Sequence, residues 1–384
     1  MLAIAVLALV SFGVVMVYSA SSARALLDEA DPMSLARRQA IYAAIGLGAF
    51  LVCSRLDVRR LRHLAPLLLG VAIVLNIAVM VPGIGTVANG ARQWIVVGPL
   101  QFQPSELAKV ALVLWIAAFA ARNPLRVQRP EGVRPALLVA GFMLLLVVVA
   151  DLGTAVVLAA GALAALLVAG APGRTLLLSI GAGATAAVLA VVAQPYRKER
   201  LLAFMDPWAD PTGSGFQTVQ AQIALGSGGW HGVGLGDGLQ KVFYLPEAHT
   251  DMIIATVGEE LGLLGVVAVI ALVCLVVVSG YRIALRARDL FQQVLAAGLT
   301  TLVAVQAVVN LGAVLGMLPV TGVPLPFVSY GGSSLVVFCA AAGILVRIGR
   351  QSHAARLTVV AGRAEGGDRG RGDGRPRHAR ARAG

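Results

Sequence analysis

The sequence predicts an all-α integral membrane protein, a bundle of about ten transmembrane helices with one large extracellular loop between the seventh and eighth. Hydrophobic residues make up 58% of the chain and charged residues only 13%, far from the balance of a soluble domain. The apolar runs are unbroken over roughly 17 to 25 residues, the length of a membrane-crossing helix. Aromatic residues, at 5%, are too few for the interfacial girdles of a membrane β-barrel.

Ten candidate spans lie between polar breaks, and together they predict one membrane domain over residues 1–350. The first could be a signal peptide because small residues follow it at Ser19 to Ala23, but it lacks a basic leader. Asp151, Leu152 and Gly153 interrupt a long apolar region and predict a tight turn between the fifth and sixth spans. The expected spans are 2–20, 39–53, 64–82, 104–121, 134–150, 154–170, 174–193, 251–280, 290–317 and 330–348.

Arginine clusters fall in alternate loops, which predicts that these loops and both termini are cytoplasmic. The residues after Gln351 are mostly Arg, Gly, Ala and Asp, so residues 351–384 are expected to form a disordered basic cytoplasmic tail. This topology accounts for the net charge of +12, and nucleic acid is not an expected partner. The clusters are Arg55, Arg59, Arg60 and Arg62; Arg122, Arg126, Arg129 and Arg134; Arg174; and Arg282, Arg286 and Arg288.

Two segments on the opposite face, 83–103 and 194–250, are long enough to suggest function. The second is the long extracellular loop, and its amphipathic stretch 217–225 predicts a short helix on or near the membrane surface. The three cysteines all lie in apolar runs without close partners, so neither a disulfide nor a metal site is expected; they are Cys53, Cys274 and Cys339.

The end of this loop is the strongest candidate site. Glu247, His249 and Asp251 lead directly into an apolar run that still contains Glu259 and Glu260. Carboxylates at a membrane helix are costly unless they face a wet cavity or a partner, so they mark a functional site. Asp251 is also expected at the N-terminus of a helix that Thr250 or Asp251 itself caps, and a plain capping role is the alternative.

A second candidate set lies at the fourth span. Glu106 and Lys109 are three residues apart on one helical face and can either neutralise each other or serve a ligand. Arg92 and Trp94 suit phosphate and sugar recognition, although a tryptophan at a membrane interface is more often a belt anchor.

Asp151 and the segment before the last span complete the candidates. Asp151 is either a turn residue satisfied by local backbone or part of a site. The segment 318–334 carries three prolines, three glycines and the hydroxyls of Ser329, Ser333 and Ser334. Such irregular backbone is tolerated at membrane depth only where it lines protein or a cavity. The chain has no Walker loop, HExxH, GxSxG or Asp-x-Asp motif, which argues against an ATP-driven pump or a zinc protease.

Six motifs in order give the chain a family resemblance: GARQWI, QPSELAK, DLGTA, GVGLGDGLQKVFYLPEAHTD, GEELG and PFVSYGGSS. They resemble the SEDS proteins of bacteria, which include FtsW and RodA, and the resemblance extends to about Arg350. GLQK followed by YLPEAHTD is closer to FtsW. The family often has Gln-Pro before the aspartate of DLGTA, whereas this chain has Val149 and Ala150, so Asp151 is the least secure correspondence.

The resemblance implies a peptidoglycan glycosyltransferase that polymerises lipid II at the outer face of the bacterial cytoplasmic membrane, with inversion and β-1,4 linkage. It implies work with a class B penicillin-binding transpeptidase and other division proteins at the septum. Asp251 would be the essential acid, acting as general base. No metal site is readable, and a divalent cation, Mg²⁺ or Mn²⁺, is a candidate cofactor beside Arg92 and Lys109, which are expected to steady the pyrophosphate. The expected substrate-binding residues are Arg92, Trp94, Glu106, Lys109, Asp151, Glu247, His249 and Ser333, with Arg38 less secure.

Three alternatives stay open. The intramembrane charges Glu106, Lys109, Glu259 and Glu260 would equally suit a lipid II flippase. The chain could instead be a scaffold for the transpeptidase, or a RodA-type elongation polymerase. A flippase needs polar residues on both sides of the midplane, and these lie mainly in the outer half, so polymerisation is favoured.

Overall fold

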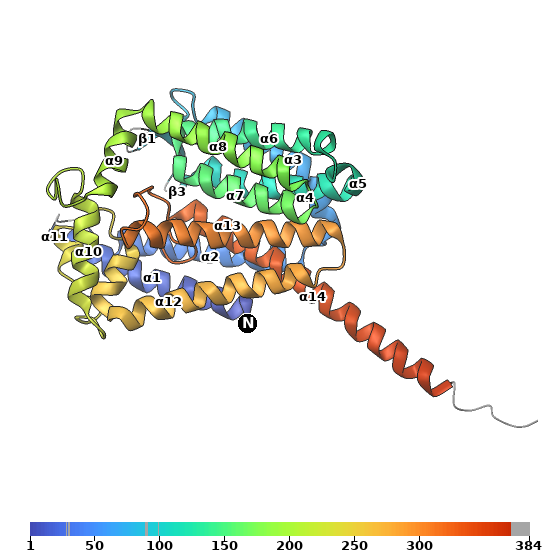
Figure 1. Ribbon diagram of the computed structural model, residues 1–384. Helices are drawn as coiled ribbons and strands as arrows, with labels where there is room; N and C mark the ends of the chain where they lie inside the picture. The colour runs from blue at the N-terminus through green and yellow to red at the C-terminus, as the bar shows by residue number, and fades with distance from the viewer. Residues whose placement is uncertain (28, 30, 89–90, 99, 370–384) are drawn as a thin grey trace, which may run out of the picture.

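The computed structural model describes residues 1–369 apart from 28, 30, 89–90 and 99. Most of its long helices run side by side as a bundle, and α9 (Pro195–Met205), α10 (Phe216–Gly228) and α11 (Gln240–Phe243) gather at one end (Figure 1). The long helices are α1 (Leu2–Leu27), α2 (Ser34–Arg55), α3 (Val58–Ala78), α4 (Pro104–Arg122), α6 (Pro130–Ala150), α7 (Leu152–Val168), α8 (Gly173–Val192), α12 (Ile253–Leu285), α13 (Leu290–Val314) and α14 (Gly332–Arg369).

These long helices confirm the predicted bundle. Within the described residues, nine are long and apolar enough to cross a membrane, and α7 is a shorter apolar helix at the position of the sixth expected span. In the most apolar window of α4 and of α13, 72% and 78% of residues are buried, against 6% for α8. The first two therefore form the centre of the bundle, and α8 lies at its edge, where apolar side chains face lipid.

A buried ion pair joins three helices at this centre. The Nζ of Lys109 on α4 donates to Glu106 Oε1 at 2.8 Å and to Gln306 Oε1 on α13 at 2.6 Å. The same ammonium lies 5.0 Å from the ring centroid of Phe338 on α14. Both charged side chains are within 1% of complete burial. The mutual neutralisation that was one of the two sequence-based hypotheses is therefore what the fold uses.

The irregular segment between α13 and α14 lies inside the protein, as expected. Gln306 Nε2 donates to the carbonyl of Pro324, and Asn310 Nδ2 donates to that of Val323, both at 2.9 Å. Gly13 of α1 packs on the same segment, and a Cβ there would lie 2.5 Å from the Val328 carbonyl oxygen. Protein groups thus satisfy backbone that lipid could not.

A small sheet stands in the segment 83–103, where no strand was expected. β1 (Gly85–Ala88), β2 (Ala91–Val97) and β3 (Leu100–Phe102) pair antiparallel in that order. The Tyr42 hydroxyl of α2 accepts the Gln101 N–H at 2.7 Å and donates to the Gln101 carbonyl at 3.2 Å. This anchor is a tertiary contact, and a three-residue strand has too little local pattern to show it.

Two other expectations for the loops have different outcomes. The helix predicted at 217–225 is confirmed by α10. α14 instead continues as a helix to Arg369, so residues 351–369 differ from the expected disordered tail, while 370–384 lie outside the described residues. Extending an existing helix avoids the cost of nucleation, and Ala, Arg and Leu favour propagation.

The central ion pair makes a testable prediction about stability. Lys109→Met leaves Glu106 buried without its partner and should lower the free energy of unfolding by about 3–5 kcal/mol. Adding Glu106→Gln should recover most of that loss, because no buried charge remains. The measurement is the thermal unfolding midpoint in detergent for both variants, with the exposed Lys198→Met as control. Equal destabilisation by the single and double changes would contradict the pairing argument.

Candidate functional site

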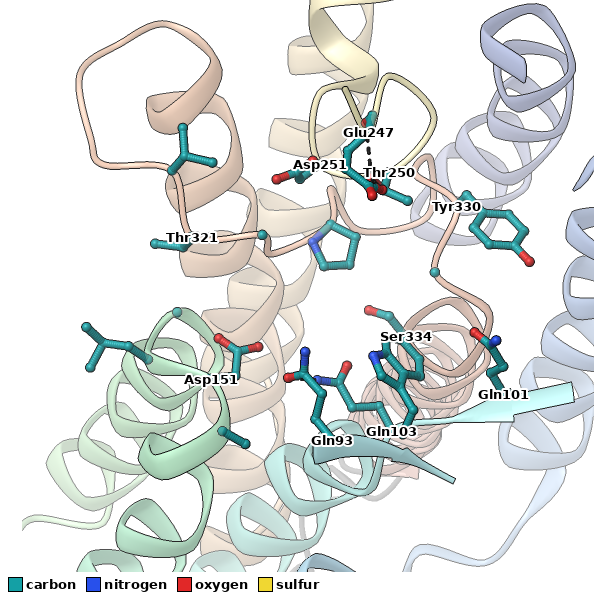
Figure 2. Close-up of a pocket in the computed structure, with 18 of the residues that line it drawn as sticks. Gln93, Gln101, Gln103, Asp151, Glu247, Thr250, Asp251, Thr321, Tyr330 and Ser334 are labelled. Carbon is teal, nitrogen blue, oxygen red and sulfur yellow. Dashed lines mark hydrogen bonds between the residues drawn. The ribbon is translucent and has the colours of Figure 1, made fainter. Parts of the chain in front are cut away.

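A cavity of about 470 Å³ lies where the loop between α8 and α12 meets the sheet and the segment between α13 and α14 (Figure 2). Its walls come from parts of the chain that are far apart in sequence. The polar and aromatic side chains among its lining residues are Tyr42, Gln93, Trp94, Gln101, Gln103, Asp151, Arg200, Glu247, His249, Thr250, Asp251, Thr321, Tyr330 and Ser334.

Asp251 lies in a tight turn before α12. The expected capping role is wrong, because α12 begins after Met252 and no side chain caps it. The turn is instead built around the carbonyl of Glu247, which accepts the N–H groups of Thr250 at 3.0 Å and Met252 at 3.3 Å. Glu247 has a φ of 55°, a left-handed conformation that is uncommon for a residue with a side chain. Such strain persists only where the surroundings enforce it, and it is most frequent at functional sites.

Two contacts from other elements hold this turn. Asn310 Nδ2 on α13 donates to the backbone carbonyl of Asp251 at 2.8 Å. The N–H of Tyr330 donates to the carbonyl of His249 at 2.9 Å, and the two rings lie 5.6 Å apart. The backbone of the turn is therefore fixed, and Asp251 lies at the cavity wall (Figure 2).

The surroundings of Asp251 make it a stronger base than an ordinary aspartate. Burial raises its pKa to about 6, and the negative charge of Glu247 contributes to the rise, while Arg200 and the Thr250 hydroxyl act to lower it. The Thr250 hydroxyl has one proton, and its oxygen lies 2.8 Å from Glu247 Oε2 but 3.3 Å from Asp251 Oδ1. Asp251 is thus ionised at neutral pH with a pKa near the range favoured for general bases.

Asp151 reaches the same cavity from the turn between α6 and α7 (Figure 2). It caps α7, because Oδ1 accepts the Thr154 N–H at 3.0 Å and Oδ2 accepts the Thr154 hydroxyl proton at 2.6 Å. The turn role and the cavity position, posed as alternatives from sequence, therefore coexist.

Three glutamines that line the cavity beside the predicted Trp94, the glutamine wall, were missed by the sequence analysis. Gln93, Trp94 and Gln101 belong to the sheet, and Gln103 follows it; Gln103 Nε2 donates to Gln93 Oε1 at 3.3 Å. Amide groups that both donate and accept, beside an aromatic ring, suit sugar hydroxyl and acetamido groups. The Gly98-Pro99 step between two apolar runs was the available signal for a strand pair.

Arg200 on α9 is the cationic side chain among the described cavity-lining residues, and it too was missed. It is half-buried and donates from Nη1 to the carbonyl of Val320 at 3.2 Å. It lies in a basic stretch, Arg197 to Arg200, where sequence alone does not distinguish a cavity residue from its neighbours.

Five of the predicted site residues do not line this cavity, and the less secure Arg38 is one of them. Glu106 and Lys109 are enclosed by the ion pair described above, and Arg92 lies on β2 outside the lining. Ser333 accepts the N–H of Gln103 at 3.2 Å, so it supports the glutamine wall, while its neighbour Ser334 lines the cavity. Trp94, Asp151, Glu247, His249 and Asp251 are brought together as expected.

Glu259 and Glu260 also have structural partners rather than a place at the cavity. Glu259 Oε1 accepts the N–H groups of Leu239 and Gln240 at 2.7 and 3.0 Å. Glu260 forms a buried ion pair with Lys241 and accepts the Ser19 hydroxyl at 2.7 Å. In the part of the chain that the structure describes, no three His, Cys, Asp or Glu side chains are grouped to hold a metal.

Known proteins are similar to most of this chain. A family model for FtsW, RodA and SpoVE, described as cell cycle protein, matches residues 1–354. The probable peptidoglycan glycosyltransferase FtsW of Geobacter metallireducens is 44% identical over 344 residues, covering 89% of this chain and 92% of that protein. Stage V sporulation protein E of Bacillus subtilis is 39% identical over 354 residues, covering 92% of this chain and 97% of that protein.

Solved structures of related proteins have a similar fold. A chain of a peptidoglycan synthase complex that coordinates polymerization and crosslinking has a TM-score of 0.72 at 33% identity, covering 91% of this chain and 97% of that one. The rod shape determining protein RodA of Thermus thermophilus has a TM-score of 0.66 at 32% identity, covering 91% and 96%. Because the match spans the bundle and the loop that carries Asp251, this chain belongs to the FtsW/RodA/SpoVE family of cell cycle proteins.

Proposed function

We propose that this protein is a peptidoglycan glycosyltransferase that polymerises lipid II. The observation that carries the proposal is Asp251, a residue 7% exposed whose backbone is held by other elements, at a cavity that also presents one arginine and a sugar-compatible wall. The names of the FtsW relatives and the likeness to a peptidoglycan synthase chain support the same activity. Incubating purified protein with labelled lipid II, with and without a class B penicillin-binding transpeptidase, tests it.

In this proposal Asp251 accepts the proton of the acceptor's GlcNAc 4-hydroxyl as that oxygen attacks the donor's anomeric carbon. The bond from this carbon to the pyrophosphate breaks with inversion, and undecaprenyl pyrophosphate leaves with the electron pair. Arg200 takes the charge-stabilising role first expected of Arg92 and Lys109, because it lines the cavity and they do not. Trp94 and the glutamines Gln93, Gln101 and Gln103 orient the sugars. A divalent cation that helps to steady the pyrophosphate stays a proposal.

The cellular setting is part of the same proposal. The arginine pattern supports cytoplasmic termini and a cavity that opens at the outer face of the cytoplasmic membrane. The FtsW names of relatives support a septal role, and the solved complex supports a class B penicillin-binding transpeptidase as partner, with other division proteins. The flippase alternative loses support, because the four charges that suggested it are occupied by protein partners.

Asp251→Asn is the most direct test of the base. The amide keeps the size of the side chain and the backbone carbonyl that Asn310 holds, so insertion and the thermal unfolding midpoint should not change. Loss of the base should lower glycan polymerisation by a factor of about 10³ or more. Near-normal glycan chain synthesis by folded Asp251→Asn protein would remove Asp251 from the chemistry.

The pH dependence of polymerisation should reveal the influence of Glu247. Because the base must be ionised, the rate should rise with pH through about 6, the pKa of Asp251. Glu247→Gln removes a negative charge that raises this pKa, so the acidic limb should move to lower pH. Thr250→Val removes a hydrogen bond that lowers it, so the limb should move to higher pH. The measurement is the pH profile of kcat/KM; shifts of the same sign in both variants would contradict this account.

Replacing Arg200 should lower polymerisation more than replacing Lys198 on the same helix, α9. Arg200→Ala should lower kcat/KM for lipid II by about 10² to 10³, because the developing charge on the pyrophosphate loses its cation. Lys198→Ala removes an exposed charge from the same helix and should have little effect. If the two variants lose activity equally, the cavity cation is not the pyrophosphate ligand.

A further inference from the structure

α12 is broken at Gly262, and a piece of the preceding loop closes the break. Gly262 has φ 66° and ψ −165°, which no helix allows. In a continuous helix, Leu263 and Leu264 would donate to the carbonyls of Glu259 and Glu260. Here Leu263 N–H donates to Gly229 at 2.9 Å, and Leu264 N–H donates to Trp230 at 3.3 Å.

The carbonyls freed by the break are satisfied by the same loop. The N–H groups of Val233 and Gly234 donate to the carbonyls of Glu259 and Glu260 at 3.0 and 3.1 Å. We call residues 229–239, between α10 and α11, the strap. Its backbone lies so close to α12 that a Cβ on Gly232 would be 2.1 Å from the Glu260 carbonyl oxygen. The strap is therefore hydrogen-bonded to α12 at the break and packs closely against it.

The inner side of the strap is polar and contacts charged groups of α11 and α12. Gly236 N–H donates to Glu260 Oε2 at 3.2 Å, and Lys241 Nζ donates to the Gly236 carbonyl at 2.8 Å. Gly238 is buried against the Glu259 carboxylate. These contacts fix which side of the strap faces away from the protein.

The outward side is apolar and continues the exposed surface of α12. Trp230 is 68% exposed and Leu239 67%, with Val233 and Leu235 also exposed. Through its carbonyl, Trp230 is bonded to Leu264, which is 55% exposed and begins an outward row with Val267. Because α12 is a membrane span, that row faces acyl chains, and the strap is an extension of it.

The length of α12 sets the depth of the strap. From Leu263 to Leu285 the helix rises about 34 Å at 1.5 Å per residue, which spans a hydrocarbon core of about 30 Å without the buried first segment. Leu264 and Trp230 therefore lie at the boundary between acyl chains and headgroups. Tryptophan is enriched at this depth, and the exposed His231 and Asp237 of the strap suit headgroup polarity.

We propose that the strap is an interfacial membrane anchor, with Trp230 and Leu239 seated in the lipid leaflet on the side of the cavity. This part of the long loop then lies in the membrane boundary and not in the aqueous layer. The anchor would also position the site. α11 and then the Asp251 turn follow the strap along the chain, so contact of the strap with lipid sets the depth of the carboxylate relative to substrate headgroups.

The test uses tryptophan fluorescence of the full-length protein in phosphatidylcholine nanodiscs, with or without bromine on the acyl chains near the headgroup. Bromine quenches an indole that it touches, so wild-type emission should fall in brominated lipid. Trp230→Phe should lose most of that quenching. Trp208→Phe, which removes another exposed tryptophan of the same long loop, should retain it.

A second variant guards against misfolding of the first. Leu239→Trp in the Trp230→Phe background places an indole elsewhere on the same outward side and should restore the quenching. Thermal unfolding midpoints confirm that each variant is folded. Quenching of the Trp230 component by aqueous iodide, together with insensitivity to brominated lipid, would overturn the anchor and assign this face to water or to a protein partner. The readout needs no substrate, so it can fail independently of the proposed polymerisation.

Discussion

Hydrocarbon offers no hydrogen-bond partner, so every carboxylate and every irregular stretch of backbone in this bundle depends on groups supplied by the protein. At least one carboxylate oxygen of each of Glu106, Glu259 and Glu260 is matched to an ammonium, a hydroxyl or backbone N–H groups. Asp251 is handled differently. It is almost as buried, and the Thr250 hydroxyl oxygen lies 3.3 Å from its Oδ1 but only 2.8 Å from Glu247 Oε2. Burial and the charge of Glu247 outweigh the groups that lower the pKa of Asp251, so its carboxylate stays basic.

Two side chains of α13 supply several of these hydrogen bonds. Gln306 and Asn310 lie one turn apart on it, both buried in the centre of the bundle. Gln306 contacts Lys109, the Pro324 carbonyl and Ser334, so it joins the ion pair to the cavity wall. Asn310 contacts the carbonyls of Asp251 and Val323, so it joins the acidic turn to the opposite segment. One amide per helical turn thus holds two irregular segments against each other around the cavity.

The glycine-rich sequence of the loop follows from the same constraint. The strap can replace the lost hydrogen bonds of α12 only if its backbone approaches that of the helix closely, and Gly232 and Gly262 make this approach possible. The two parts of α12 then differ in environment. The short part before Gly262 is almost completely buried in protein, and the longer part after it presents apolar side chains outward. A single hydrophobic run therefore contains both a support for the Asp251 turn and a membrane span.

The sequence by itself predicted about ten spans in their order and placed the candidate site at the acidic loop before α12, because long apolar runs and unsatisfied charges are costly wherever they fold. It did not distinguish Lys109 from Arg200. Both are cations near apolar segments, and only the packing of α4 against α13 and α14 encloses one while α9 brings the other to the cavity. The glutamine wall required Tyr42 of α2 to anchor a three-residue strand. Tertiary structure alone decided these points, since each depends on contacts between segments remote in sequence and no local pattern encodes such a contact.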